Sequence, residues 1–124
     1  MESYVGGEKE AMELRRNESI VKENIAVSLF RGIEVVSGRL TITSDRLYFQ
    51  PHSLHIQTQP LELNLKDIAT VEKRNTLFMI PNGMKIKMHN GQDHTFLGWK
   101  RAEIMGSIQD TKKEQKMTVI IKTR

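Results

Sequence analysis

The sequence contains no cysteine, and this absence excludes several kinds of chemistry. Disulfide bridges, thiolate metal sites and cysteine nucleophiles cannot form, which suits a reducing compartment. No apolar run approaches the ~20 residues that span a bilayer. The first ten residues, MESYVGGEKE, lack the basic and apolar regions of a signal peptide. We therefore expect a cytoplasmic protein that is not integral to a membrane, although it can lie peripherally at one.

Aromatic residues are also scarce, at 6% of the 124 residues. If Phe49, Phe78 and Phe96 fill the core, Tyr48 and Trp99 remain as the plausible groups to stack on nucleic-acid bases, so single-stranded nucleic acid is a weak candidate ligand. Catalytic signatures are missing as well: there is no Gly-x-Ser-x-Gly elbow and no glycine-rich phosphate or dinucleotide loop. We expect no enzyme activity and no cofactor.

The four histidines are the natural candidates for metal ligands. His52 and His55 are three residues apart, and His89 and His94 flank a predicted hairpin. A zinc site needs a third or fourth ligand close by, and the sequence pattern places none there. We therefore predict no metal site, and we interpret His94 as a hydrogen-bonded structural residue near Ile86.

The charge of the chain is unevenly divided. Residues 1–24 contain four Lys/Arg and six Glu, a net charge of −2, so residues 25–124 carry +6 and the whole chain carries +4. A basic excess in the folded part favours an acidic partner, which can be an anionic lipid surface, nucleic acid or an acidic protein. The length of 124 residues suits one domain with one core.

Short apolar or alternating runs separated by Gly, Asn, Pro and Asp begin near Asn24 and are typical of antiparallel strands. The predicted strands are 25–31, 38–44, 46–50, 60–65, 69–74, 76–80, 83–89 and 92–97. A helix over Trp99–Asp110 follows, and its apolar face is formed by Ile104, Met105 and Ile108. A short helix is also expected near Glu8–Arg16.

Hairpin parity predicts the strand register, because a shift of one residue turns every side chain to the other face. Around Ser44-Asp45, Leu40 lies opposite Phe49 and Ile42 opposite Leu47. A three-residue loop at His89-Asn90-Gly91, with Gly in the left-handed conformation, pairs Met84 with Phe96. A similar loop at Pro81-Asn82-Gly83 pairs Ile80 with Met84 and Phe78 with Ile86. The predicted core face is Phe78, Ile80, Met84, Ile86, Met88 and Phe96.

The same parity directs Leu77 and Met79 outward, beside Lys85 and Lys87. Apolar and cationic side chains on one face can form a docking patch for an anionic membrane or a partner protein. Scattered apolar surface residues are also ordinary, and the N-terminal segment can cover them. The candidate lipid- or partner-binding surface comprises Lys73, Arg74, Leu77, Met79, Lys85, Lys87 and Trp99.

Three segments in this order, GRLTITSDRLYF (38–49), LNLKDIATVEKR (63–74) and MKIKMHNGQDHTF (84–96), followed by a helix, resemble a GRAM domain. This family is a member of the pleckstrin-homology-like superfold, and the resemblance covers residues 18–110. It implies a mainly β chain, a PH-like bent antiparallel barrel or sandwich capped by a C-terminal α-helix. Residues 1–17 would then be a charged N-terminal extension, and residues 111–124 a charged connector and a short β-prone tail.

The resemblance also implies a non-catalytic binding module, a peripheral adaptor for membrane lipid or for a membrane-linked protein. Pleckstrin-like domains often bind phosphoinositides between their first strands, yet FRGIEVVSG offers only Arg31 against Glu34. An alternative is a self-associating module, in which Met117–Ile121 or the outer face forms a homo-oligomer contact. Single-stranded nucleic-acid binding is the weaker third hypothesis.

Overall fold

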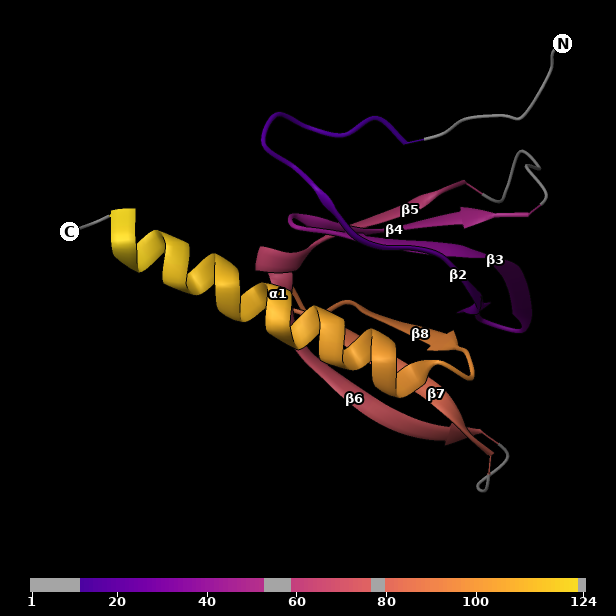
Figure 1. The fold of residues 1–124 in the computed structure, drawn as a ribbon. Helices are drawn as coiled ribbons and strands as arrows, with labels where there is room; N and C mark the ends of the chain where they lie inside the picture. Colours follow the sequence, from indigo (N-terminus) through magenta and orange to yellow (C-terminus); the bar gives the residue numbers. More distant parts are fainter. Residues whose placement is uncertain (1–11, 53–58, 77–79, 123–124) are drawn as a thin grey trace, which may run out of the picture.

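The computed structural model describes residues 12–52, 59–76 and 80–122 (Figure 1). Strands dominate the first part of the chain, and one long helix ends it. The elements are β2 (Ile20–Arg31), β3 (Glu34–Thr43), β4 (Arg46–Pro51), β5 (Leu61–Asn64), the 3-10 turn η1 (Leu65–Asp67), β6 (Ile68–Thr76), β7 (Ile80–Met88), β8 (Asp93–Leu97) and α1 (Arg101–Lys122).

The strands form one strongly bent antiparallel sheet in the order β5-β4-β3-β2-β8-β7-β6. Figure 1 shows the bend as two layers, with β2 to β5 in one and β6 to β8 in the other. Strands β5 and β6 end the order and do not pair over their described residues, so the sheet is an open sandwich and not a closed barrel. Helix α1 contacts β7 and η1. The predicted PH-like sandwich capped by a C-terminal helix is confirmed.

Alternating side chains from both layers fill one core between them. In the first layer Leu40 pairs with Phe49 and Ile42 with Leu47, as predicted, and all four are buried. The rings of Phe49 and Phe96 meet across the core with centroids 5.7 Å apart. Burial of such aromatic side chains is a large contribution to the stability of a small domain.

The predicted hairpin between β7 and β8 is also confirmed. Gly91 has φ of 94°, its N–H donates to the carbonyl of Met88 at 3.0 Å, and Met84 lies opposite Phe96. A left-handed residue at this place is what a three-residue loop requires.

The second predicted three-residue loop, at Pro81-Asn82-Gly83, is wrong. These residues lie inside β7, where Ile80 pairs with Thr76 and Gly83 with Arg74. A Cβ on Gly83 would lie 2.6 Å from the carbonyl oxygen of Arg74, so this glycine permits a close approach of two strands and does not form a turn.

The expected pairs of Ile80 with Met84 and of Phe78 with Ile86 are therefore not formed. Ile86 lies between Val71 and His94 instead. Of the predicted core face, Met84, Ile86, Met88 and Phe96 are buried. Phe78 falls outside the described residues.

The ends of the chain also differ from expectation. Residues 12–16 are not helical, which corrects the described part of the short helix expected at 8–16. Asn17 has φ of 65°, a left-handed conformation that turns the chain toward β2. Residues 8–11 lie outside the described residues.

At the other end, α1 does not stop at Asp110 but continues to Lys122, so the expected charged connector and β-prone tail are helical. Two residues make three hydrogen bonds that hold the first of the additional turns against the rest of the domain. Lys112 Nζ donates to the carbonyls of Leu65 and Ile68, both at 2.8 Å, and Gln115 donates to the carbonyl of Ser44 at 2.8 Å. The helix then continues through MTVII, where Met117 and Val119 are exposed, so the β propensity of this segment is not realised.

Candidate functional site

The cationic surface expected from the sequence lies on the outer face of β6, β7 and β8. Glu72 is opposite Lys85 and Arg74 is opposite Gly83, so Arg74 and Lys85 share a face with Lys87. Lys73 is opposite the buried Met84 and therefore lies on the other side of the sheet. The structure thus brings together three of the four predicted cations.

Carboxylates from the same strands pair with these cations. Lys85 lies 3.5 Å from Asp93, Lys87 lies 3.3 Å from Glu72, and Arg74 lies 3.1 Å from Glu72. Surface ion pairs contribute little to stability, but they reduce the positive potential of the face. Over its described residues, the positive and negative charges of this surface therefore nearly balance, and the surface is less positive than the sequence pattern indicated.

The remaining residues of the predicted surface are Leu77, Met79 and Trp99. Leu77 and Met79 lie outside the described residues. Trp99 lies in the turn between β8 and α1 and is 77% exposed. An exposed indole is unusual in a small domain and suits an interface, because its ring is amphipathic.

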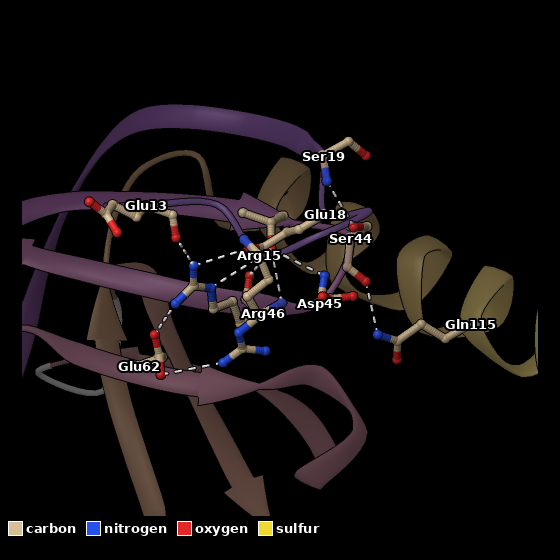
Figure 2. A network of polar contacts seen from close by, with 10 residues as sticks. Glu13, Arg15, Glu18, Ser19, Ser44, Asp45, Arg46, Glu62 and Gln115 are labelled. Carbon is tan, nitrogen blue, oxygen red and sulfur yellow. Dashed lines mark hydrogen bonds and ion pairs between the residues drawn. The ribbon is translucent and has the colours of Figure 1, made fainter. Parts of the chain in front are cut away.

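A buried polar cluster joins the N-terminal segment to the first layer (Figure 2). Arg46 donates to Glu18 through Nε at 2.8 Å and Nη2 at 3.0 Å, and its Nη2 also donates to the carbonyl of Glu13 at 2.6 Å. Glu62 accepts from Nη1 of the same guanidinium. Thr43 donates to Glu18 at 2.5 Å.

These contacts change the ionisation of the two buried partners. Burial works to raise the pKa of Glu18, but hydrogen bonds from Arg46, Arg15 and Thr43 outweigh it and lower the pKa to about 2. The hydrogen bond to Glu18 raises the pKa of Arg46 against the opposing effect of burial. Both groups are charged, and each makes several hydrogen bonds within the cluster. We therefore interpret the cluster as a structural clamp and not as a reactive site.

The histidines are spread over the described part of the chain. His52 and His89 are exposed, and His94 is half-buried opposite Ile86. Burial lowers the pKa of His94, Asp93 opposes this, and Arg31 adds to it. His55 lies outside the described residues. Within residues 12–52, 59–76 and 80–122, no three His, Asp or Glu side chains lie together as metal ligands would.

The outer face of β2, β3 and β4 carries a second surface, which sequence reasoning missed. A hollow of about 330 Å³ opens there, lined by Met12, Ile20, Glu23, Arg39, Thr41 and Tyr48 among others. Further along the same strands Phe30 and Val35 lie opposite each other and are 46% and 51% exposed. The hairpin parity used for the other strands, applied to β2 and β3, would have predicted that Phe30 and Val35 lie opposite each other on the outer face.

The C-terminal end of α1 is a third surface. Residues 111–124 contain five Lys/Arg and one Glu, a net charge of +4, whereas the preceding 110 residues contain equal numbers of positive and negative groups. Lys113 and Lys116 are exposed, and Met117 and Val119 are each more than half exposed. A count of charged residues over short windows of the sequence would have shown that the net positive charge is concentrated in residues 111–124.

The two-layered bent sheet with its terminal helix defines a pleckstrin-homology-like domain. Solved structures with this fold include the C-terminal domain of an unknown protein from Leishmania infantum (TM-score 0.67, 16% identity, 78% of this chain and 86% of that chain). The N-terminal PH domain of Vps36 matches with a TM-score of 0.62 and 21% identity, over 86% of each chain. The linker-DH/PH domains of p115-RhoGEF match with a TM-score of 0.62 and 12% identity over 78% of this chain, which spans 30% of that one.

Residues 8–115 match the model of the GRAM domain family, and the chain belongs to that family. The match extends beyond the expected span of 18–110 at both ends, which agrees with the clamp around Arg46 and with the longer helix. No curated protein sequence matches this chain. No helix within the described residues is long and apolar enough to cross a membrane.

Proposed function

We propose that the protein is a non-catalytic adaptor that docks peripherally on an anionic membrane surface through the C-terminal end of α1. The observation that carries this proposal is the charge distribution. The net charge of residues 111–124 equals that of the whole chain, so the excess positive charge that an anionic surface attracts lies at this end. Each Lys or Arg near an anionic bilayer contributes about 1 kcal/mol of attraction.

The apolar side chains at the same end support a membrane surface as the ligand. Gln115 makes a contact with the sheet, through the carbonyl of Ser44, and α1 continues beyond it to Lys122. Met117 and Val119 are exposed in this extension next to the cationic Lys113 and Lys116. Helices that combine basic and apolar side chains in this way bind the boundary between headgroups and acyl chains.

The surface expected from the sequence (Lys73, Arg74, Leu77, Met79, Lys85, Lys87 and Trp99), of which Arg74, Lys85 and Lys87 share one face, is the second candidate surface for the same function. The exposure of Trp99 favours it, and the ion pairs of Lys85 and Lys87 with Asp93 and Glu72 count against it. GRAM and PH-like domains are in general lipid- or protein-interaction modules, and both surfaces are compatible with that role.

Co-sedimentation with vesicles tests the proposal. The full chain is mixed with vesicles of phosphatidylcholine alone and of phosphatidylcholine with phosphatidylserine. We expect binding only to the anionic vesicles, decreasing with salt. The variant Lys113→Glu with Lys116→Glu should abolish it. The matched control, Lys85→Glu with Lys87→Glu, makes the same change in net charge on the other surface and should retain most of the binding.

The outcomes separate the candidates. Equal binding to both kinds of vesicle overturns docking by charge on an anionic surface. No binding to either kind overturns a membrane role and leaves a protein ligand. Loss of binding in the control variant alone transfers the role to the outer face of β6 to β8. Equal loss in both variants shows that net charge and not a defined surface decides the binding.

A further inference from the structure

The sheet has two free edges, and β6 forms the longer one (Figure 1). Strand β6 covers nine residues, Ile68–Thr76, whereas β5 at the other edge covers only four. Along an edge strand every second residue directs its backbone N–H and C=O away from the sheet, where they can pair with another strand. Among the described strands, only β7 pairs with β6. The outer edge of β6 is therefore a template for one further strand.

The regular part of this edge is short. The register of β6 with β7 is continuous from Thr70 to Arg74, and it shifts on either side, between Ile68 and Thr70 and between Arg74 and Thr76. Irregularities of this kind bend a strand and limit the length over which another strand can add to it. The edge therefore suits a short peptide segment better than an open-ended assembly of strands.

Helix α1 holds both ends of this regular part in place. Arg101 Nη1 donates to the carbonyl of Arg74 at 3.1 Å, and Lys112 Nζ donates to the carbonyl of Ile68 at 2.8 Å. A strand that is already fixed loses little conformational entropy when it pairs with a ligand, and this favours binding. The edge of β6 is thus preorganised for a further strand.

The inward side of the edge combines an apolar residue with a cationic one. Val71 lies opposite the buried Ile86 and is partly buried against the core, whereas Lys73 lies opposite the buried Met84 and is exposed. Lys73 makes no ion pair within the described residues, unlike Arg74, which pairs with a carboxylate. A lysine on the inward side of an edge strand opposes pairing with an arbitrary strand. A strand that brings a carboxylate to the neighbouring position removes this obstacle.

We propose that the edge of β6 binds an extended peptide of a partner protein, with an acidic side chain beside Lys73 and an apolar, β-branched side chain beside Val71. In this mode of recognition the backbone hydrogen bonds provide affinity, and alternate side chains provide specificity. Charge disfavours a second copy as the occupant. The acidic residue in the regular part of β6 is Glu72, which lies opposite Lys85 on the outer side, so a second β6 brings no carboxylate to Lys73. The inference does not depend on the proposed membrane role.

Fluorescence anisotropy of a labelled peptide with the full chain tests the inference. The probe is a peptide in which threonine alternates with valine and glutamate in turn, so that one side of the strand carries valine and glutamate. We expect saturable binding. Two further peptides are methylated on the backbone nitrogens, one at the threonines and one at the valines and glutamates. Both keep every side chain, but one of them presents its methyl groups to β6 and should bind at least about tenfold more weakly.

Substitutions in the chain locate the binding edge. Lys73→Glu changes an exposed residue and should weaken the binding of the unmethylated peptide about fivefold. Arg39→Glu makes the same change in net charge at an exposed position of β3, in the other layer, and should leave the binding unchanged. Hydrogen exchange followed by nuclear magnetic resonance should become slower for outward-directed amides of residues 70–74 when the peptide is bound.

Several results would overturn the inference. The first is the absence of binding at millimolar peptide, and the second is binding that neither set of methyl groups weakens, because strand addition needs the backbone donors. Equal loss in Lys73→Glu and Arg39→Glu would show that net charge decides the binding. Exchange that becomes slower only outside β6 would place the peptide elsewhere. A dimer of the chain that Lys73→Glu alters, in the absence of peptide binding, would make a second copy the occupant.

Discussion

Glu18 and Arg46 form a buried ion pair in which the carboxylate accepts hydrogen bonds from Nε at 2.8 Å and from Nη2 at 3.0 Å of the guanidinium. The Glu18 side chain is fully buried and that of Arg46 is 7% exposed. The pair joins the start of the described chain to β4, so it fixes the path by which the N-terminal segment enters the sheet (Figure 2).

Glu18→Gln should destabilise the domain at neutral pH. The pKa of Glu18 is lowered from 4.5 to about 2. A shift of that size corresponds to about 3 kcal/mol of preference for the charged form in the folded chain, at 1.36 kcal/mol per pKa unit. Urea unfolding measures the loss. Glu13→Gln is the control, since Arg46 contacts the backbone carbonyl of Glu13, and it should change the stability little.

The same group should make the stability depend on pH. The folded pKa lies below the unfolded one, so the unfolded chain takes up the proton first as the pH falls. The contribution of Glu18 to the free energy of unfolding is therefore complete above pH 4.5 and disappears progressively toward pH 2. Thermal melts of wild type and Glu18→Gln should converge over this interval. A gap between the two melting curves that stays constant down to pH 2 would contradict the ionisation argument.

Gly83→Ala should destabilise the domain by about 1–3 kcal/mol. A Cβ there would lie 2.6 Å from the Arg74 carbonyl oxygen and 3.1 Å from the Arg74 Cβ, and neither backbone can move without breaking the β6–β7 pairing. Gly106→Ala is the matched change inside α1, where a Cβ meets nothing within 4 Å, and it should stabilise by about 1 kcal/mol. Chemical denaturation that finds Gly83→Ala neutral would show that the two strands are further apart.

Phe96→Ala should cost about 3–5 kcal/mol, because Phe96 is 1% exposed and its ring meets Phe49 between the two layers. Phe30→Ala removes the same ring from an exposed site and should have little effect on the stability of the monomer. Denaturant midpoints of the two variants test the assignment of core and surface. Equal losses of stability in the two variants would contradict the assignment of Phe96 to the core and of Phe30 to the surface.

Lys112→Met should destabilise the domain by about 1–2 kcal/mol, because the carbonyls of Leu65 and Ile68 lose a charged donor at 2.8 Å. Lys113→Met removes the neighbouring, exposed lysine and serves as the control. Far-ultraviolet circular dichroism should show less helix in Lys112→Met if this contact holds the last turns of α1 on the sheet. Unchanged helix content would mean that the extension forms without it.

Where a local loop fixes the register, the sequence predicted the structure well. The turns at Ser44-Asp45 and His89-Asn90-Gly91 imposed the pairs of Leu40 with Phe49 and of Met84 with Phe96, because parity leaves one register with an apolar face. The Pro81-Asn82-Gly83 segment failed this reasoning. A glycine that admits a neighbouring strand and a glycine that makes a turn look alike in a sequence, and only the pairing with Arg74 distinguishes them.

The candidate site was less predictable, because charges separated in sequence meet in the sheet. Lys85 and Lys87 were identified as a cationic pair, but their partners Asp93 and Glu72 come from the two neighbouring strands. Local sequence cannot give the distance between a lysine and a carboxylate on another strand. It therefore overstated the positive potential of that face.

The sequence alone determined the class of fold and the inward row of apolar residues, because alternation in strands and spacing in a helix are local properties that burial enforces. It also determined the location of the net charge. Only the tertiary structure decided that MTVII is helical, that Glu18 and Arg46 share a buried clamp, and that a hollow opens on the outer face of β2, β3 and β4. These features depend on contacts between distant segments, whose energies outweigh local propensity only when the whole sheet has formed.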